Sequence, residues 1–205
     1  AHQKEKEERA NLIKKQQQQQ KLYNELSEQI DRLKKEAIQK NKEAKKLEEE
    51  IKIIIKNKAP NNTNIDFEKE KTKIDWPVKN PVIMSRFGRV DHPVLGPEIK
   101  LINNGIELVV SKEKNTVYSV LPGVVSKIVI LPKSLKRVVI IRHGDYFTVY
   151  KNLRIEAGGI QLGDYVEKME EIGRVYIEDG HKTGLMEFQI WKGTEALNPK
   201  NWLKK

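Results

Sequence analysis

Residues 1–58 carry apolar side chains at helical spacing, with no helix-breaking residue between Lys4 and Lys58. This stretch contains neither glycine nor proline, and it is dense in Lys, Glu, Gln, Leu and Ile, which helices tolerate or favour. The apolar residues follow alternating steps of three and four when Gln16, Gln19 and Lys40 are accepted as polar members. The apolar members of this seam are Leu12, Tyr23, Leu26, Ile30, Leu33, Ala37, Ala44, Leu47, Ile51 and Ile54. The pattern predicts a coiled-coil helix over residues 1–58.

A helix of this length needs a partner along its apolar stripe. Fifty-five residues of helix would span about 80 Å, and most helical stability in proteins comes from packing of the apolar face. We therefore expect the coiled coil to pair with another helix. A charged, solvated helix without a partner is the alternative interpretation.

The pattern changes twice after the predicted helix. Pro60 and the asparagines around it favour a turn, so residues 59–75 are predicted to be a linker. From Trp76 onward, short runs of β-branched and aromatic residues alternate with Gly or Pro, and they predict an all-β domain over residues 76–205. The predicted strands are Ile106–Val110, Val117–Val120, Val124–Ile130, Val138–Arg142 and Tyr146–Tyr150.

Composition narrows the classes of protein that fit this layout. Charged residues make up 33% of the 205 residues and hydrophobic residues only 38%, which is too polar for one compact core or a membrane span. The net charge of +10 favours an acidic or anionic partner, but it is spread over both halves and comes mostly from Lys, so no nucleic-acid binding is predicted. The absence of Cys excludes disulfides, thiolate zinc sites and cysteine nucleophiles.

Several short motifs of the β region follow one another in the order and approximate spacing of a known family. They are Trp76-Pro77, Phe87-Gly88-Arg89, Asn104-Gly105-Ile106-Glu107-Leu108, Leu121-Pro122-Gly123-Val124-Val125, the block His143–Leu153, Gly163-Asp164-Tyr165-Val166 with Ile172-Gly173, Met186–Ile190 and Leu197–Leu203. Together they resemble the LytM or lysostaphin-like zinc endopeptidases, which cut peptidoglycan cross-bridges. The resemblance implies a LytM-like, β-sandwich or barrel-like domain.

The residues at the zinc-ligand positions of that family depart from its pattern. The family holds zinc with the His and Asp of an H-x-x-x-D segment and the second His of an H-x-H segment, where this sequence has Asn103, Glu107 and Glu187. Two assisting histidines align with Asn152 and Leu185. The resemblance therefore predicts a degenerate domain that is not an enzyme, with no catalytic residue, no metal site and no cofactor. Binding of a hard cation by the two glutamates is the open alternative.

A substrate cleft that has lost its metal can still bind a peptide or a protein segment. The predicted partner-binding groove is lined by Asn103, Asn104, Glu107, His143, Asn152, Glu187, Gln189 and Trp191. Strand alternation places Glu187, Gln189 and Trp191 on the groove face and turns Phe188 and Ile190 toward the core. Trp191 is interpreted either as the anchor of a partner or as a residue that closes the edge of the sandwich.

A coiled coil followed by a degenerate LytM domain resembles the layout of the EnvC-type murein hydrolase activators. This resemblance implies a non-catalytic regulator that binds and activates peptidoglycan amidases during cell division or cell separation, in the periplasm or cell envelope. It also implies that the coiled coil pairs with a missing helical arm or a second copy and connects to an ABC-transporter-like division complex. The alternatives are an active zinc endopeptidase with an unusual ligand set and a structural protein that binds peptidoglycan.

Overall fold

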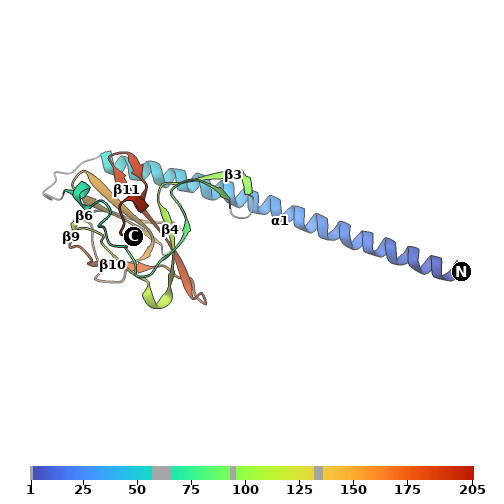
Figure 1. Ribbon diagram of the computed structural model, residues 1–205. Coiled ribbons are helices and arrows are strands. Elements are labelled where there is room, and N and C mark those ends of the chain that lie inside the picture. The colour runs from blue at the N-terminus through green and yellow to red at the C-terminus, as the bar shows by residue number, and fades with distance from the viewer. Residues whose placement is uncertain (1, 57–65, 93–95, 132–135) are drawn as a thin grey trace.

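The computed structural model describes residues 2–56, 66–92, 96–131 and 136–205 and consists of one long helix and a β domain (Figure 1). Helix α1 (His2–Lys56) is 55 residues long, as the unbroken helical pattern predicts. Its N-terminal part projects well beyond the β domain, and its C-terminal part lies against that domain (Figure 1). Within the described residues, no helix combines the length and the apolar character that a membrane span requires.

The described residues of the β domain form twelve strands and three short 3₁₀ helices. The strands are β1 (Val82–Ser85), β2 (Gly88–His92), β3 (Gly96–Asn103), β4 (Ile106–Ser111), β5 (Thr116–Tyr118), β6 (Gly123–Ile130), β7 (Arg137–His143), β8 (Tyr146–Arg154), β9 (Tyr165–Val166), β10 (Glu171–Val175), β11 (Thr183–Lys192) and β12 (Glu195–Leu197). The 3₁₀ helices are η1 (Phe67–Glu70), η2 (Lys112–Lys114) and η3 (Pro199–Asn201). All five strands predicted from the sequence are present, with ends that differ by a few residues.

Ten of these strands form one antiparallel sheet, in which β1, β4, β11, β8, β7, β6 and β9 are neighbours in that order. Strand β10 pairs with both β8 and β5, and β12 pairs with β11, while β2 and β3 form a separate hairpin. The described strands of the β domain thus form one branched sheet and a separate hairpin. The main core of the domain lies on one face of the branched sheet, where side chains of β4, β7, β8 and β11 meet those of β5 and β10.

The packed β domain begins before the predicted boundary at Trp76. Phe67 of η1 is buried in the main core, and its ring stacks on Tyr146 with centroids 4.4 Å apart. Ile74 is also buried, and it bridges Leu203 near the end of the chain. Residues 66–75 of the predicted linker therefore belong to the domain, whereas its first part, up to residue 65, lies outside the described residues.

The C-terminal turns of α1 pack on the opposite face of the sheet and form a second, smaller core. Ile51 and Ile55 are buried there, with Leu47 and Ile54 partly buried beside them. Their neighbours come from the middle of the sheet: Val138 and Ile140 of β7, Phe147 and Val149 of β8, and Trp191 of β11. This contact buries the apolar face of a helix against a β-sheet, which is one of the standard layer arrangements of domains.

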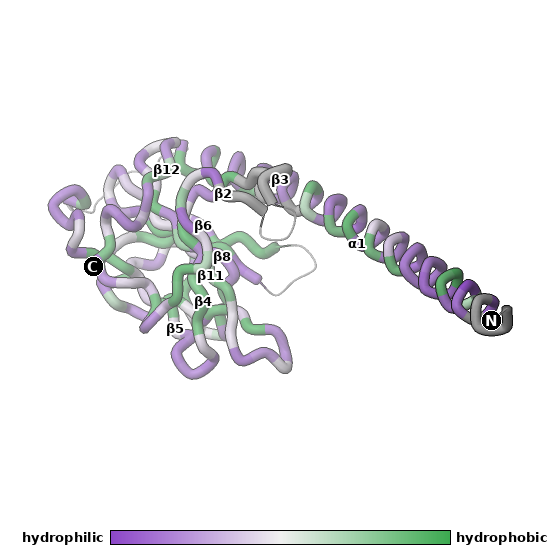
Figure 2. The backbone as a smooth tube through the Cα atoms, turned by 45° about the vertical axis from the view of Figure 1, so that its right-hand side comes forward, coloured by the Kyte–Doolittle hydropathy of each residue, from purple (hydrophilic) through white to green (hydrophobic). Residues whose placement is uncertain are grey.

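The helical seam thus divides into two parts with different surroundings. Leu47, Ile51 and Ile54 contact the chain's own β domain, so this part of the seam is not free for a second helix. The seam residues of the projecting part are exposed, namely Leu12, Tyr23, Leu26, Ile30 and Leu33. Hydrophobic positions recur along this part of α1 (Figure 2). Ala44 lies outside the described side chains.

Candidate functional site

Two glutamates face each other at the centre of the sheet face that α1 partly covers. Glu107 of β4 and Glu187 of β11 are directly opposite in the antiparallel register, and Glu187 is in turn opposite Lys151 of β8. The positions aligned with two zinc ligands of the LytM-like family therefore lie side by side. Opposite residues of antiparallel strands have Cβ atoms within about 5 Å, so the three side chains form one cluster.

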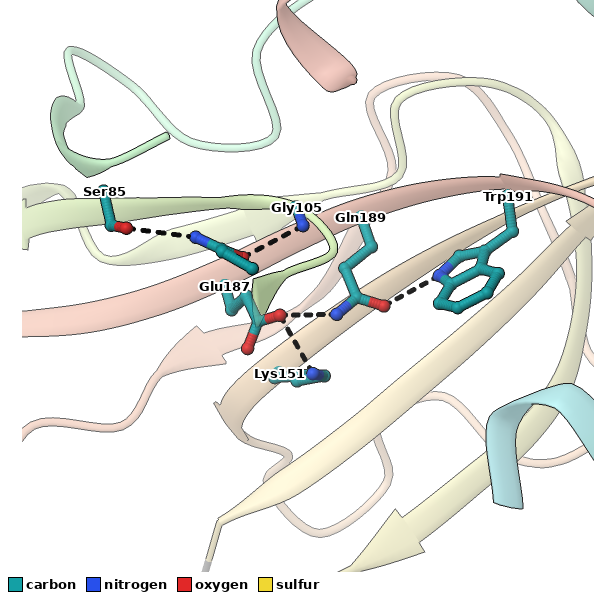
Figure 3. Close-up of polar contacts among 7 residues, drawn as sticks. Ser85, Gly105, Lys151, Glu187, Gln189 and Trp191 are labelled. Carbon is teal, nitrogen blue, oxygen red and sulfur yellow. Dashed lines mark hydrogen bonds and ion pairs between the residues drawn. The ribbon is translucent and has the colours of Figure 1, made fainter. Parts of the chain in front are cut away.

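Lys151 neutralises one of these carboxylates. Its Nζ lies 2.9 Å from Oε1 of Glu187, and the two side chains are only 12% and 20% exposed. The same Oε1 accepts a hydrogen bond from Nε2 of Gln189, and Oε1 of Gln189 accepts one of 2.7 Å from Nε1 of Trp191. Figure 3 shows this chain of contacts, with Glu187 between Lys151 and Gln189 and with Trp191 beyond Gln189. Glu187 is thus held in one orientation by the strand neighbours on its own face.

The electrostatic environment of Glu107 favours its protonated form. Its pKa is raised, first because burial disfavours its charged form and then because the negative charge of Glu187 is close. Lys151 opposes this shift. Lys151 makes its direct ion pair with Glu187, while burial and the nearby negative charge favour the neutral form of Glu107.

Asn103 has a structural role at the turn between β3 and β4. Its Oδ1 accepts a hydrogen bond of 3.0 Å from the N–H of Gly105, and its Nδ2 donates one of 3.2 Å to Oγ of Ser85. Gly105 is needed at this turn because a Cβ there would collide with the backbone carbonyl of Phe188. Asn104, the residue between them, is half-buried at the same turn.

Asn152 lies at an irregularity of β8. The pairing of β8 with β7 passes from Lys151 to Leu153 and skips Asn152, whose φ of 65° is in the left-handed region that Asn tolerates. Its carbonyl accepts a hydrogen bond of 2.8 Å from the N–H of Tyr176. The position that aligns with an assisting histidine is thus occupied by a residue that supports a bulge in the strand.

The structure separates His143 from the other predicted groove residues. His143 is fully buried on the main-core face, with its ring 5.6 Å from that of Phe67. Nδ1 lies 2.7 Å from the carbonyl of Pro122, which can only accept, so Nδ1 carries the proton and Nε2 accepts from the Thr148 hydroxyl at 2.8 Å. Burial lowers the pKa of His143 to about 4. The prediction that this imidazole lines the groove is wrong, because strand alternation turns it to the other face.

Trp191 is on the predicted face but is not available as an anchor for a partner. It is 1% exposed and lies in the second core with Ile51 and Ile55 of α1. Phe188 and Ile190 lie in the main core, as the alternation predicts. The sequence could assign the face of Trp191 but not the helix that covers it. Of the open interpretations, the packed tryptophan is the one that the structure supports.

Sequence reasoning also missed Lys151, although a signal for it was present. Alternation along β8 places Lys151 on the same face as Phe147 and Val149. A lysine on an otherwise apolar strand face indicates that its ammonium group pairs with a carboxylate. The face on which Lys151 lies follows from strand alternation alone. The partner itself depends on the pairing of β8 with β11, which is a tertiary property.

These residues do not fit the zinc ion that the LytM resemblance implies. Asn103 directs its amide oxygen to a backbone N–H, and Oε1 of Glu187 is shared by Lys151 and Gln189. The ammonium group of Lys151, which lies 2.9 Å from Oε1 of Glu187, would repel a divalent cation at this carboxylate. Within the residues that the structure describes, no three His, Cys, Asp or Glu side chains are grouped closely enough to hold a metal ion.

Comparison with known proteins agrees with the fold. The sequence profile of peptidase family M23 matches residues 101–199, which include β4 to β12. No curated protein matches this chain.

Three similar solved structures can be compared directly. One is a chain of the SpoIIQ–SpoIIIAH pore-forming complex, with 27% identity over 64% of this chain and 91% of that chain and a TM-score of 0.48. Csd3 of Helicobacter pylori has 24% identity over 64% of this chain and 35% of its own length, with a TM-score of 0.50. A protein of Pseudomonas aeruginosa described as an M23 peptidase has 16% identity, a coverage of 75% and 57%, and a TM-score of 0.51.

The last two similarities establish the fold alone. The chain spans about a third of the length of Csd3, so that protein has large regions without a counterpart here. The profile match and these similarities together support a β domain whose fold is similar to that of peptidase family M23, the LytM-like fold, after a long N-terminal helix.

Proposed function

We propose that this chain is a non-catalytic regulator that binds and activates a peptidoglycan amidase in the periplasm or cell envelope, during cell division or cell separation. The observation that carries the proposal is the Glu107–Glu187–Lys151 cluster. It occupies ligand positions of the zinc site in the resembled family, and it places the ammonium group of Lys151, which repels a dication, against one of the carboxylates. A domain that keeps the fold of a peptidase but not its metal site retains a surface for extended segments.

The same sheet face offers a surface on which an amidase segment can dock. Val82 of β1 is opposite Val109 of β4, two residues from Glu107, so its side chain is on the face of the glutamates. Val82 and Met84 are both exposed, and they form an apolar border beside the charged cluster. We expect an amidase segment with apolar residues, and with a cationic or amide group over Glu107, to bind there.

The projecting part of α1 supplies the proposed connection to the rest of the division machinery. Its exposed apolar residues repeat at coiled-coil spacing beyond the region that contacts the β domain. We propose that they pair with another helix, either a second copy or a helical arm, and that this coiled coil contacts an ABC-transporter-like complex. Direct binding of peptidoglycan by the same chain is compatible with this role.

Release of dye from labelled sacculi by a purified peptidoglycan amidase tests the proposal. We expect the full chain to raise the amidase rate about tenfold and to release nothing by itself. Met84→Glu places a charge on the apolar border and should reduce the activation severalfold. The matched control is Leu162→Glu, an equally exposed leucine in the loop before β9, which should activate as the original chain does.

Two results would contradict the proposal. Cleavage of stem peptides or cross-bridges by the chain alone would indicate an active endopeptidase. Firm binding to sacculi without stimulation of any amidase would instead favour the structural peptidoglycan-binding alternative.

A further inference from the structure

The sheet of the β domain has an open edge at β6. Strand β9 pairs with β6 only at Gly123 and Val124, and loop residues 163 and 164 extend the contact to Val125. Beyond this point β6 continues for five more residues to Ile130, paired with β7 on its inner side. In the part of the chain that the structure describes, no strand pairs with its outer side. The outward N–H and C=O groups of this stretch, which belong to alternate residues between 126 and 130, are therefore not paired with a described strand.

Helix α1 runs beside this edge and forms an apolar groove with it. The groove is lined by Glu50, Ile53 and Ile54 of α1 and by residues 127–130 of β6. Ile53 is 57% exposed and Ile130 is 62% exposed, so large apolar side chains on both elements face solvent. Val129 points to the α1 side and packs in the second core, whereas Ile128 packs against the main core, so the two faces of the edge differ.

An open edge of this kind is unusual for a protein that exists alone. Natural proteins protect edge strands with charges, proline, bulges or a covering segment, because an exposed apolar edge pairs with other chains. Here a bulge lies between Val125 and Lys127, and Lys127 is the one charged residue from there to Ile130. Strand β1, at the other end of the main strand order, has only four residues. The β6 edge therefore combines a longer free backbone with an apolar wall.

We propose that the β6 edge and the last turns of α1 form a docking site for an extended segment of another protein, which adds to the sheet as a strand. The backbone groups require an extended occupant, because only a strand can pair with a row of alternating donors and acceptors. The wall formed by Ile53 and Ile54 requires apolar residues at alternate positions of the segment. Lys127 is on the same face as Val129, so its exposed ammonium group favours an acidic residue next to these apolar residues, on the same face of the segment. The site is separate from the groove proposed for the amidase, and its occupant need not be the same protein.

A synthetic strand peptide tests this site directly. The probe is a fluorescein-labelled ten-residue peptide in which four valines and one glutamate alternate with five threonines, and its binding to the full chain is measured by fluorescence anisotropy. We expect saturable binding that Ile53→Glu and Lys127→Glu each weaken about tenfold, because the first places a charge against the valines of the probe and the second repels its glutamate. Both residues are exposed, so the variants should keep the circular dichroism spectrum and the unfolding temperature of the original chain.

Two controls make the result specific to strand addition at this edge. The same peptide with N-methylated backbone amides should not bind, since it keeps the side chains but cannot pair with a strand. Met84→Glu changes an equally exposed side chain on β1 and should leave the affinity unchanged. The proposal is overturned if the methylated peptide binds as well as the unmodified one, if the β6 and α1 variants bind normally, or if the edge only mediates self-association of the chain. Met84→Glu is also the variant that should lose amidase activation, so the two proposals can fail independently.

Discussion

At the scale of single residues, strand phase decides which side chains can act together. Glu107, Lys151 and Glu187 come from three strands and share one face because each occupies the same phase of its alternation. His143 is out of phase with them and is buried on the other face. The chemical character of the face therefore comes from two carboxylates and an ammonium group, without the imidazole of His143.

The burial of His143 predicts a pH dependence of folding. Its pKa is lowered to about 4 in the folded chain, against an ordinary value of 6.5 in the unfolded chain. As the pH falls from about 6.5 to 4, the unfolded chain takes up a proton that the folded chain does not. The stability that neutral His143 contributes above this range is therefore lost across it, by about 3 kcal/mol in the free energy of unfolding.

Urea unfolding of the chain and of His143→Gln between pH 7 and pH 4 measures this contribution. The free energy of unfolding of the original chain should fall more steeply with decreasing pH than that of the variant. His181→Gln, a change of an exposed histidine, is the control and should follow the original chain. Parallel curves for the original chain and His143→Gln would show that His143 does not carry this pH dependence.

At the scale of elements, one amphipathic pattern on α1 has two different partners. The residues at positions 47, 51 and 54 contact β7, β8 and β11, whereas those at 12 to 33 project away from the β domain. Heptad spacing indicates only that a helix has an apolar stripe. A sheet with an apolar face can bury this stripe as well as a second helix can. The sheet face around Trp191 is such a surface.

Removal of a buried isoleucine from the α1 contact should uncover Trp191. Ile51→Ala leaves a cavity in the second core, and changes of this type cost about 2–5 kcal/mol where the site is fully packed. Because the last turns of α1 hold the helix on the sheet, we expect this variant to release them locally. Acrylamide quenching of tryptophan fluorescence should increase, and amide hydrogen exchange in residues 45–56 should become faster.

The matched control is Ile53→Ala, which changes an exposed isoleucine two residues further along the same helix. It should leave both the quenching and the exchange rates unchanged. Equal effects of the two substitutions would mean that the contact between α1 and the sheet does not depend on Ile51.

At the scale of the whole molecule, the long helix extends an apolar stripe far from the β domain, and the remaining question is what pairs with it (Figure 2). Leu26 and Ile30 lie in the middle of the exposed seam. If this seam forms the proposed coiled coil, the isolated chain should dimerise through a second copy, and Leu26→Glu combined with Ile30→Glu should shift it to the monomer.

Analytical ultracentrifugation over a range of protein concentrations measures this shift. Ile38→Glu, an exposed residue of α1 outside the seam, should leave the association unchanged. A monomeric original chain throughout that range would exclude pairing with a second copy.

Much of the architecture follows from local pattern. The absence of Gly and Pro and the apolar spacing predict α1, and the alternation of β-branched residues predicts the main strands and the inward direction of Phe188 and Ile190. The identity of the residues at the family's ligand positions is also a property of the sequence alone. These features depend on the period of the backbone, which neighbouring residues determine.

The tertiary structure decided what lies opposite each face. It placed Ile51 over Trp191, turned His143 into the main core, brought Lys151 to Glu187 and added Phe67 to the packed domain. A local pattern defines which side chains share a face, but it does not contain the strand order or the path of the chain that brings another element onto that face. For this reason the sequence determined the elements and the residues that align with zinc ligands of the resembled family, and only the folded chain determined which of the candidate side chains remain accessible to a partner.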